Sequence, residues 1–469
     1  MLEYKKAIEP VQTLGISEER NKVRIISRYD FIGLEHLKLK WWITTDGAKV
    51  SNGGEFEMPS GIEPHKETVL VIPGLSENFI SLPDSHLNLE FTLKEKTNWG
   101  EAGHIVATGQ VQLTKPLALD QVLYPPSSLT RSASSGIRAS LMSALSLSPS
   151  STPTVIVHQT SPSTLSITSS SGSAWEFNLV AGGLTSWKRG GDDGNLLTTP
   201  LLFELYRAPT DNDRLCDFGR NWLDRRLHET KSHPVSTTWS TIKGSPSASD
   251  PDTPKHDVVE LICKNRIAPP VFNWALETTS RYWFFADGRV LIRVKAKQTG
   301  DNRPRAWARF GFVATLKGCE AARWFGRGPG EAYRDKKESQ LVGEWEGTVD
   351  GILAGAEHYE YPQDGGNRTD VRWVEFLSFS SSEPGGKRLL RARFGDFEGA
   401  SFQAQRYDTK DIVASKHPYE LKKRARKGEA VVRLDWMHHG LGTGSCGPET
   451  LPQYSLDAGR DIDVSVLLD

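Results

Sequence analysis

The residues of this chain best suited to acid–base chemistry are two aspartates in one short motif. The segment RAPTDND places Asp211 and Asp213 on either side of Asn212, shortly after Arg207. Two carboxylates so close together can serve as a general acid and a general base. They can equally accept charge-assisted hydrogen bonds from the arginine and hold a loop in one shape. The residue types alone leave both roles open.

Two other groups of residues suggest ligand binding, but their spacing argues against it. His438 and His439 are adjacent, so on a strand they point to opposite faces and cannot hold one metal ion together; packing or surface positions are favoured. The segment RWFGRGPGEAYRDKK, residues 323–337, is rich in glycine. However, Pro329 removes a backbone donor, and no Gly-Lys-Ser or Gly-Lys-Thr follows. Neither a metal site nor a phosphate loop is predicted.

The elements that position these residues are strands. In the first part of the chain, apolar and polar residues alternate in NKVRIISRYDF, HLKLKWWITTDGAKV, HLNLEFTLKEK and HIVATGQVQLT, with an Asp-Gly turn at Asp46. Several such segments, separated by Pro, Gly and Asn turns over about 115 residues, are typical of an immunoglobulin-size antiparallel sandwich. We therefore predict an immunoglobulin-like β-sandwich over residues 1–118.

The composition then changes abruptly. Residues 119–152 are rich in Ser and Pro and too poor in large apolar side chains to form a core, which predicts a linker or insertion that is protease-sensitive from about residue 126 to residue 152. A second patch of this kind, residues 243–257, is interpreted as a surface loop. The first stretch separates the two predicted sandwiches, and the second is a loop within the larger one.

From residue 153 to residue 469 the strand pattern returns, as in RVLIRVKAKQT, AWARFGFVATL and AVVRLDWMHHG. Only GRNWLDRRLHET, residues 219–230, has apolar residues at helical spacing. Strands and helices do not alternate regularly along the sequence, which argues against a parallel sheet. The predicted fold class is all-β, an immunoglobulin-like β-sandwich followed by a large antiparallel β-sandwich.

Charge and cysteine usage narrow the class of protein. The 469 residues carry a net charge of -1, so no overall attraction to nucleic acid is expected. No run approaches the roughly 18 apolar residues of a membrane span, and the first residues lack a secretory apolar region. The basic run 422–427 is interpreted as a solvated turn rather than an anion or localisation patch. Four widely spaced cysteines argue against zinc or a disulfide framework and favour a cytoplasmic protein: Cys216, Cys263, Cys319 and Cys446.

Three long stretches together carry a family resemblance. They are LYRAPTDNDR (205–214), the segment 323–337 with its sequel HYEYPQDGGNRTDVRW (358–373), and LDWMHHGLGTGSCGPETLPQY (434–454). In this order they resemble the C-terminal part of the glycoside hydrolase family 2 β-galactosidases. The start, EYKKAIEPVQ, is similar to the segment that follows the family's catalytic barrel, and residues 20–115 to the next immunoglobulin-like domain. The resemblance implies that the large sandwich is the small-chain domain, a galactose-mutarotase-like supersandwich.

The resemblance also implies roles for particular residues. It places Cys446 where the family has an aromatic residue or a cysteine beside the bound sugar, although by type alone Cys446 is equally a buried thiol. Residues 214–221 resemble a loop that moves over the sugar site, but an expected glycine is displaced and Gly219 is the nearest. The segment 323–337 resembles a signature that shapes a turn, with glycines at unusual backbone angles above packed aromatics. A scaffold for the site loop is implied for Arg207, Asp211, Asn212 and Asp213.

The resemblance finally implies that the catalytic groups lie outside this chain. Retaining glycosidases use two carboxyl groups roughly 5 to 5.5 Å apart. In this family both lie on a (β/α)₈ barrel upstream of the matching region, as do most magnesium and sodium ligands. No catalytic residue and no cofactor are therefore assigned to this chain.

Two interpretations follow. The chain is a component of a β-galactosidase that hydrolyses terminal β-D-galactosides such as lactose. It would then act with a barrel-bearing chain or a missing N-terminal portion, as an oligomer once assembled. Alternatively, it is a non-catalytic carbohydrate-binding or structural β-sandwich protein. Neither nucleic acid nor a membrane is expected as a partner.

Overall fold

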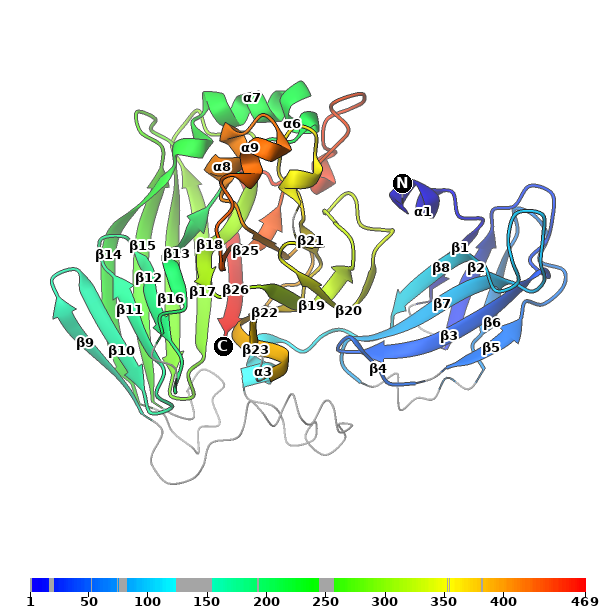
Figure 1. Cartoon of the computed structure of the whole chain (residues 1–469), viewed down its shortest axis with the longest axis horizontal. Helices are drawn as coiled ribbons and strands as arrows, with labels where there is room; N and C mark the ends of the chain where they lie inside the picture. Colours follow the sequence, from blue (N-terminus) through cyan, green and yellow to red (C-terminus); the bar gives the residue numbers. More distant parts are fainter. Residues whose placement is uncertain are drawn as a thin grey trace. The chain divides into compact units, whose positions relative to one another are not determined.

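Strands are the predominant regular element in the computed structural model of the chain (Figure 1). It describes residues 2–16, 21–51, 53–73, 75, 82–123, 154–191, 194–243, 257–351, 353, 355–380 and 383–469. They form two compact units, one of residues 1–118 with 325–328 and 336–345, the other of residues 119–324, 329–335 and 346–469. The sheets are antiparallel wherever a register is defined. The all-β prediction is confirmed.

The first unit contains two sheets. One has the order β1-β2-β6, and the other has the order β4-β3-β7-β8 with β5 paired to β3. The elements are α1 (Leu2–Ala7), β1 (Val11–Gly15), β2 (Lys22–Ser27), β3 (Leu37–Thr45), β4 (Ala48–Lys49), β5 (Gly54–Glu57), β6 (Glu67–Val71), β7 (Ser85–Leu93) and β8 (Ile105–Gln112).

Alternation along these strands builds the core of the first unit. Val23 and Ile25 of β2 are fully buried, as the pattern predicts, because alternate side chains of a strand share one face. Asp46 and Gly47 form the predicted turn between β3 and β4, with φ angles of 46° and 86°. Two left-handed residues match the twist of a two-residue hairpin, which explains the Asp-Gly pair.

Two nine-stranded sheets are built mainly from residues of the second unit. The first has the order β21-β24-β25-β18-β13-β12-β11-β10-β9, and the second β14-β15-β16-β17-β26-β23-β22-β19-β20. The strands are β9 (Val155–Ser161), β10 (Thr164–Ser169), β11 (Ala174–Asn178), β12 (Gly183–Lys188), β13 (Leu197–Glu204), β14 (Lys231–Ile242), β15 (Val258–Ala268), β16 (Ala275–Phe285), β17 (Val290–Thr299), β18 (Arg309–Lys317), β19 (Ala321–Gly328), β20 (Leu341–Thr348), β21 (Arg368–Thr369), β22 (Trp373–Ser380), β23 (Glu383–Phe394), β24 (Ser401–Gln405), β25 (Glu429–His438) and β26 (Ile462–Leu468).

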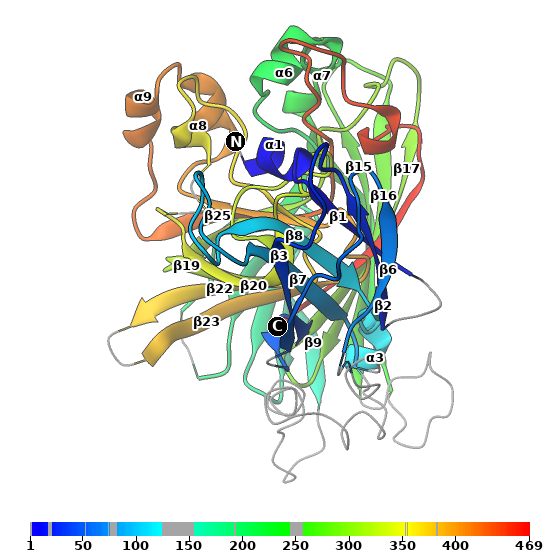
Figure 2. The same ribbon diagram turned by 90° about the vertical axis from the view of Figure 1, so that its right-hand side faces the viewer.

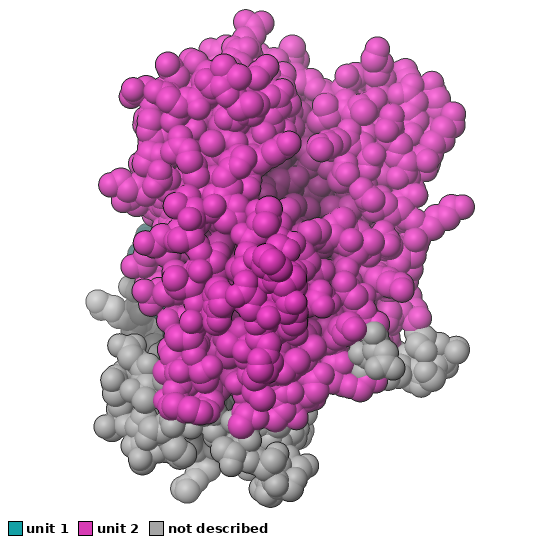
Figure 3. Space-filling model, turned by 90° about the vertical axis from the view of Figure 1, so that its left-hand side faces the viewer, with its two compact units in different colours: residues 1–118, 325–328, 336–345 teal, residues 119–324, 329–335, 346–469 magenta. Residues whose placement is uncertain are grey.

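Aromatic side chains join these two sheets face to face. The rings of Trp175 on β11 and Phe284 on β16 lie 5.3 Å apart, and those of Phe376 on β22 and Phe402 on β24 lie 6.1 Å apart. Such tilted and edge-on pairs bury large apolar areas. One face of the second unit is hollowed along its middle (Figure 3).

Short helices gather at one end of the second unit, as Figures 1 and 2 show for α6 to α9. The predicted helix at 219–230 is partly confirmed: α7 ends at Asp224, and Arg226 takes a left-handed φ of 55° before a 3₁₀ turn. The remaining helices are too short to give a recognisable period in the sequence. The bounds are α3 (Leu119–Leu123), α6 (Asp211–Leu215), α7 (Asp217–Asp224), η1 (Leu227–Glu229), η2 (Ala356–His358), α8 (Thr409–Ala414), α9 (Pro418–Lys422) and η3 (Pro452–Tyr454).

Most of the two Ser-rich stretches lies outside the described residues. Of the predicted linker 119–152, only residues 119–123 are described, and they form α3. There Leu119 and Leu123 pack against Leu467. Residues 244–256 of the predicted surface loop 243–257 are also outside the described residues. The domain boundary near residue 152 therefore stays a prediction.

The segment 323–337 packs its aromatics as predicted but uses its glycines differently. Trp324 and Tyr333 are fully buried. None of the three glycines between Phe325 and Glu331 has a positive φ, so the expectation of unusual backbone angles is wrong. Gly328 provides space instead: a Cβ there would lie 2.5 Å from the indole of Trp345.

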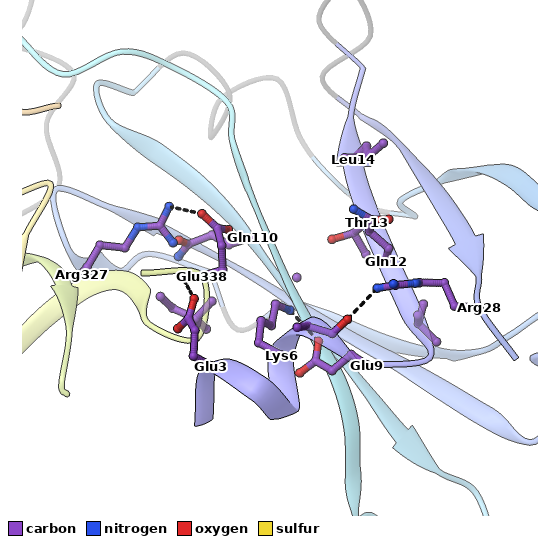
Figure 4. A pocket seen from close by; sticks show the side chains of 14 residues that line it. Glu3, Lys6, Glu9, Gln12, Thr13, Leu14, Arg28, Gln110, Arg327 and Glu338 are labelled. Atoms are coloured by element: carbon purple, nitrogen blue, oxygen red, sulfur yellow. Dashed lines mark hydrogen bonds and ion pairs between the residues drawn. The ribbon is translucent and has the colours of Figure 1, made fainter. Parts of the chain in front are cut away.

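The first unit also holds a cavity of about 410 Å³ lined by charged residues (Figure 4). Its groups are engaged with their neighbours: Lys6 contacts Glu9 at 2.6 Å, and the Glu3 carboxylate accepts from the backbone N–H of Glu338 at 2.8 Å. These contacts hold α1 in place, and no binding function follows from them. Separately, none of the helices in the described ranges is long and apolar enough to cross a bilayer.

Candidate functional site

A buried ion pair organises the segment between β13 and α6. Thr210 caps α6: its Oγ1 accepts a hydrogen bond from the Asp213 N–H, and the Asp213 carboxylate accepts one from the Thr210 N–H at 2.9 Å. The same carboxylate accepts from Arg207 Nε at 3.2 Å and Nη2 at 2.8 Å. Arg207 is 0% and Asp213 1% exposed. Both charges are removed from water, so each is stabilised by its partner and would be costly to bury alone.

Arg207 also ties this segment to the end of β25. Its Nη1 donates to the His439 carbonyl at 2.7 Å and its Nη2 to the Gly440 carbonyl at 3.2 Å. The guanidinium lies 5.3 Å from the ring centre of Trp222 on α7. Burial works against its charge, but Asp213, with smaller contributions from Asp364 and Tyr333, leaves the pKa of Arg207 raised. One side chain thus joins three segments that are distant in sequence.

Asn212 joins the same segment to the Gly-rich loop 440–450. Its Nδ2 donates to the Gly442 carbonyl at 2.8 Å, and its Oδ1 accepts from the Ser445 N–H at 3.1 Å and Oγ at 2.6 Å. The loop is fixed from the other side as well, because Asp335 accepts from the Gly442 N–H at 2.7 Å. Asn212 therefore holds both ends of one turn.

Asp211 and Arg214 connect α6 to the third motif segment, 358–373. The Asp211 N–H donates to the Gln363 side chain at 2.6 Å, and the Arg214 guanidinium lies 4.1 Å from the ring centre of Tyr361. The Asp211 carboxylate itself is 59% exposed and pairs only with Arg214, at 3.1 Å, in the described part of the chain. The structure thus brings the three motif segments together at one end of the second unit.

Cys446 lies at the tip of the Gly-rich loop. Residues 443–447 form one helical turn, in which the Cys446 and Gly447 N–H groups donate to the Thr443 carbonyl at 3.0 and 2.6 Å. Gly444 faces Cys216, since a Cβ on it would lie 2.7 Å from the Cβ of that cysteine. Cys446 itself is exposed.

The segment 214–221, likened above to a mobile loop, is mostly helical. It runs from the end of α6 into α7. Gly219 lies inside α7, where a Cβ would clash with the Asp213 carbonyl oxygen, so glycine lets the two helices pack closely. Trp222 anchors α7: it is fully buried and donates to the Ala306 carbonyl at 2.8 Å.

A cluster of buried charges lies on the neighbouring strands β13, β18 and β25 and in the loop before β21. Arg309 Nη2 donates to Asp364 at 3.0 Å and to Gln403 at 2.9 Å, and its Nη1 lies 3.4 Å from Glu204 and 3.6 Å from Asp435. Burial works against the charge of Arg309, but Asp435, Asp364 and Glu204 together raise its pKa. One guanidinium is the common partner of three carboxylates.

His438 and His439 belong to the packed interior. Their exposed fractions are 1% and 0%, so the suggestion that they are surface residues is wrong and the packing alternative holds. Burial, followed by the charge of Arg207, lowers the pKa of both rings well below its usual value. The His438 Nε2 lies 3.1 Å from Arg309 Nη2, whereas the His439 ring packs 4.5 Å from Phe218. Across the ranges given above, no three His, Cys, Asp or Glu side chains are grouped so that they could hold a metal ion.

Sequence reasoning missed the charged cluster for a physical reason. The strand VVRLDWM alternates apolar and polar residues, which normally marks a face in water. Here Arg433 and Asp435 face other strands and loops, and both are at most 1% exposed. A pattern of alternation shows that two faces differ, but not that one of them is solvated. Only the resemblance drew attention to this region.

Asp435 is the most unusual group in the cluster. It is fully buried, and within the described residues neither carboxylate oxygen has a hydrogen-bond partner. Burial raises its pKa to about 7; Arg309 opposes this rise and Glu204 adds to it. The side chain is therefore partly neutral near physiological pH.

This raised pKa predicts a pH-dependent stability. An unfolded aspartate has a pKa of about 3.9, so the protonated form of Asp435 stabilises the fold at low pH, and this stabilisation is lost as the pH rises through about 7. Asp435→Asn removes the titrating group. We expect the difference in free energy of unfolding, variant minus parent, to increase by about 1.4 kcal/mol for each unit of pH between about pH 5 and 7. Urea denaturation across this range measures the gain, and parallel curves would contradict the raised pKa.

The fold and these motifs define a class of protein. Residues 169–468 match the family model described as the β-galactosidase small chain, and residues 23–114 match β-galactosidase domain 4. The first match covers more than half of the chain. The chain therefore belongs to the β-galactosidase small-chain family, and it corresponds to the C-terminal part of these enzymes without the catalytic barrel.

Individual relatives agree with this family. The β-galactosidase of Kluyveromyces lactis is 28% identical over 462 residues, which cover 98% of this chain and 37% of that protein. The β-galactosidase of an Arthrobacter species is 24% identical over 481 residues, covering 97% and 40%. The chain thus spans well under half the length of these relatives.

Two solved structures also resemble the chain. A GH36 α-galactosidase from Geobacillus stearothermophilus has a TM-score of 0.30 at 8% identity, covering 67% of this chain and 40% of that one. A galactose 1-epimerase from Lactobacillus acidophilus has a TM-score of 0.27 at 8% identity, covering 68% and 98%.

Proposed function

We propose that this chain supplies the non-barrel domains of a β-galactosidase and part of its sugar site, for the hydrolysis of terminal β-D-galactosides such as lactose. The observation that carries the proposal is the joining of three motif segments at one end of the second unit. Arg207 and Asn212 make the joining contacts, to the carbonyls of His439 and Gly442. Side chains fixed in this way can orient a substrate.

Cys446 is the residue proposed to contact the sugar. Its thiol is exposed at the tip of a loop that Asn212 and Asp335 hold from both sides. A thiol is small and polarisable and can pack against the C–H face of a sugar ring. The scaffold role of Arg207 and Asp213 fits their enclosure, because a carboxylate that accepts from Arg207 and Thr210 and is 1% exposed is out of reach of a substrate.

Catalysis in this proposal belongs to a barrel-bearing part of the enzyme. Retaining hydrolysis needs a carboxyl pair roughly 5 to 5.5 Å apart, which the family resemblance places on the barrel together with the magnesium and sodium sites. The proposal accordingly assigns no ion to this chain. All four cysteines are free, which supports a location in the cytoplasm.

A reconstitution assay tests this function. The chain is mixed with a β-galactosidase polypeptide from which the matching region has been removed, and turnover of a chromogenic β-galactoside is measured. We expect no turnover by the chain alone or by the truncated polypeptide, and turnover by the mixture. Turnover by the chain alone would overturn the division of roles. Failure of the mixture, combined with galactoside binding by the chain alone, would favour a carbohydrate-binding protein.

Replacing Cys446 tests the site residue. Cys446→Trp enlarges the surface available to a sugar, so we expect the reconstituted enzyme to change its inhibition by galactose and its KM for lactose several-fold. Stability should change little, because an exposed loop tip accommodates bulk. Cys446→Ser, which nearly conserves size, is the matched control. A marked loss of thermal stability with unchanged kinetics would show instead that the thiol packs in the interior.

A further inference from the structure

The second unit carries a strongly basic segment at the end that holds the candidate site. Residues 409–427, called the basic lobe here, comprise α8, α9 and the turn after them. They contain seven Lys and Arg but only two Asp and Glu, an excess of five positive charges in a chain whose net charge is -1. Its exposed cations are Lys410, Lys416, Lys422, Lys423, Arg424 and Lys427. The charge is therefore concentrated in one place.

Most of this charge has no ion-pair partner among the described residues. Arg426 lies 2.9 Å from Asp408, and Arg424 lies 3.9 Å from Asp411. In the described ranges, no carboxylate lies within ion-pair distance of the lobe's lysines, which are Lys410, Lys416, Lys422, Lys423 and Lys427. Like charges gathered on a surface repel one another, and a partner of opposite charge relieves that repulsion.

The basic lobe is attached directly to the candidate site. Ile412 and Leu421 of the lobe pack with Ala208 of the RAPTDND motif in one apolar cluster. Thr409 Oγ1 donates to Glu204 at the end of β13 at 2.7 Å. Figures 1 and 2 show α8 and α9 at the same end of the unit as α6 and α7. Whatever completes the site therefore lies close to the lobe.

Exposed apolar side chains occupy the site loops at this end. Leu215, Tyr361 and Leu451 have exposed fractions of 69%, 43% and 48%. We call these three residues the apolar loop surface. Protein interfaces commonly combine an apolar centre with a charged rim. The apolar loop surface and the basic lobe together have this composition.

The chemistry of the lobe favours a protein partner over nucleic acid or a membrane. Single-stranded nucleic acid binders offer open aromatic faces for stacking. Here the ring of Tyr419 is stacked on His417, with centroids 5.6 Å apart, and Lys423 lies over it at 5.4 Å. A membrane surface would need apolar anchors on the lobe itself. Apart from Tyr419, only Val413 is a strongly exposed large apolar residue among the described residues of the lobe.

We infer that the basic lobe and the apolar loop surface form one docking surface for a protein whose face is apolar at its centre and acidic opposite the lobe. This inference rests on the proposed function, because the occupant is the barrel-bearing part of the enzyme. The lysines act at the rim, where charges chiefly set the rate of association and its salt dependence.

The experiment reverses charge in the lobe and measures association. The triple variant Lys416→Glu, Lys422→Glu and Lys427→Glu is compared with the parent in binding to a Kluyveromyces lactis β-galactosidase that lacks the matching region. We expect the association rate at low salt to fall by about tenfold or more, and the difference to vanish at high salt. The matched control reverses three exposed lysines on β14, β15 and β17, Lys231, Lys264 and Lys297, and should change the rate less than about twofold.

The outcomes separate the inference from the function on which it rests. No association by the parent would overturn both. Association by parent and lobe variant at equal rates would overturn the docking surface alone and leave the proposed function standing. Equal slowing by the lobe and control variants would show a general effect of charge, which also overturns the inference. Circular dichroism of each variant confirms that the fold is retained.

Discussion

Replacing Asp213 by alanine is expected to lower the free energy of unfolding of the second unit by about 3–5 kcal/mol, because it leaves a buried arginine without its anion. Arg207 is 0% exposed, and its remaining hydrogen bonds go to neutral groups, the carbonyls of His439 and Gly440 among them. The variant also loses half of the capping box at Thr210. Urea denaturation, followed by circular dichroism, measures the loss.

The same motif supplies the control. Asp211→Ala removes a carboxylate that is 59% exposed and paired only with Arg214 in the described structure, so a loss of about 1 kcal/mol or less is expected. Equal losses for the two variants would show that Arg207 is not a buried, dependent charge. Such a result would remove the proposed scaffold for the site loop.

The second large effect is expected for Arg309→Met. Methionine keeps an unbranched apolar stem, shorter than that of arginine, and leaves Asp364, Asp435 and Glu204 without their shared cation. Breaking a buried ionic group in this way costs about 3–5 kcal/mol. Burial raises the pKa of Asp435 to about 7, so this carboxyl group is protonated near pH 5 and needs the arginine less there; the loss should therefore be smaller near pH 5 than near pH 8.

The pH dependence separates charge from packing in this experiment. A loss that is the same at both pH values would mean that Arg309 contributes mainly by filling space. Arg293→Met is the matched control on the same unit, since Arg293 pairs with Asp463 at 2.7 Å but is 50% exposed. An exposed pair of this kind contributes at most about 1 kcal/mol.

The strands were predictable from the sequence because burial on one face imposes a period of two. Val23 and Ile25 follow this rule, and the Asp46-Gly47 turn follows from backbone geometry. The rule fails where both faces of a strand are covered, as for Arg433 and Asp435 on β25. Short helices such as α6 could not be predicted for another reason, because five residues are too few to show a helical period.

The candidate site was only partly predictable. The motif identified Arg207 and Asp213 as neighbours, because they lie close together along the chain. The contacts of Asn212 with Gly442 and Ser445 span more than two hundred residues, and no local pattern encodes them. The role of the glycines in 323–337 was wrong for a similar reason: the space at Gly328 is set by Trp345, a residue from another strand.

The position of β26 within its sheet has a consequence for how the protein is made. This strand, Ile462–Leu468, lies between β17 and β23 in the interior of the sheet, yet it follows every other strand of the sheet in the sequence. Until β26 has been synthesised, β17 and β23 each have an unpaired edge where this strand will pair. Such edges are prone to pairing with other chains. A nascent or prematurely terminated chain is therefore expected to need chaperones more than the complete chain, in which β26 pairs with both edges.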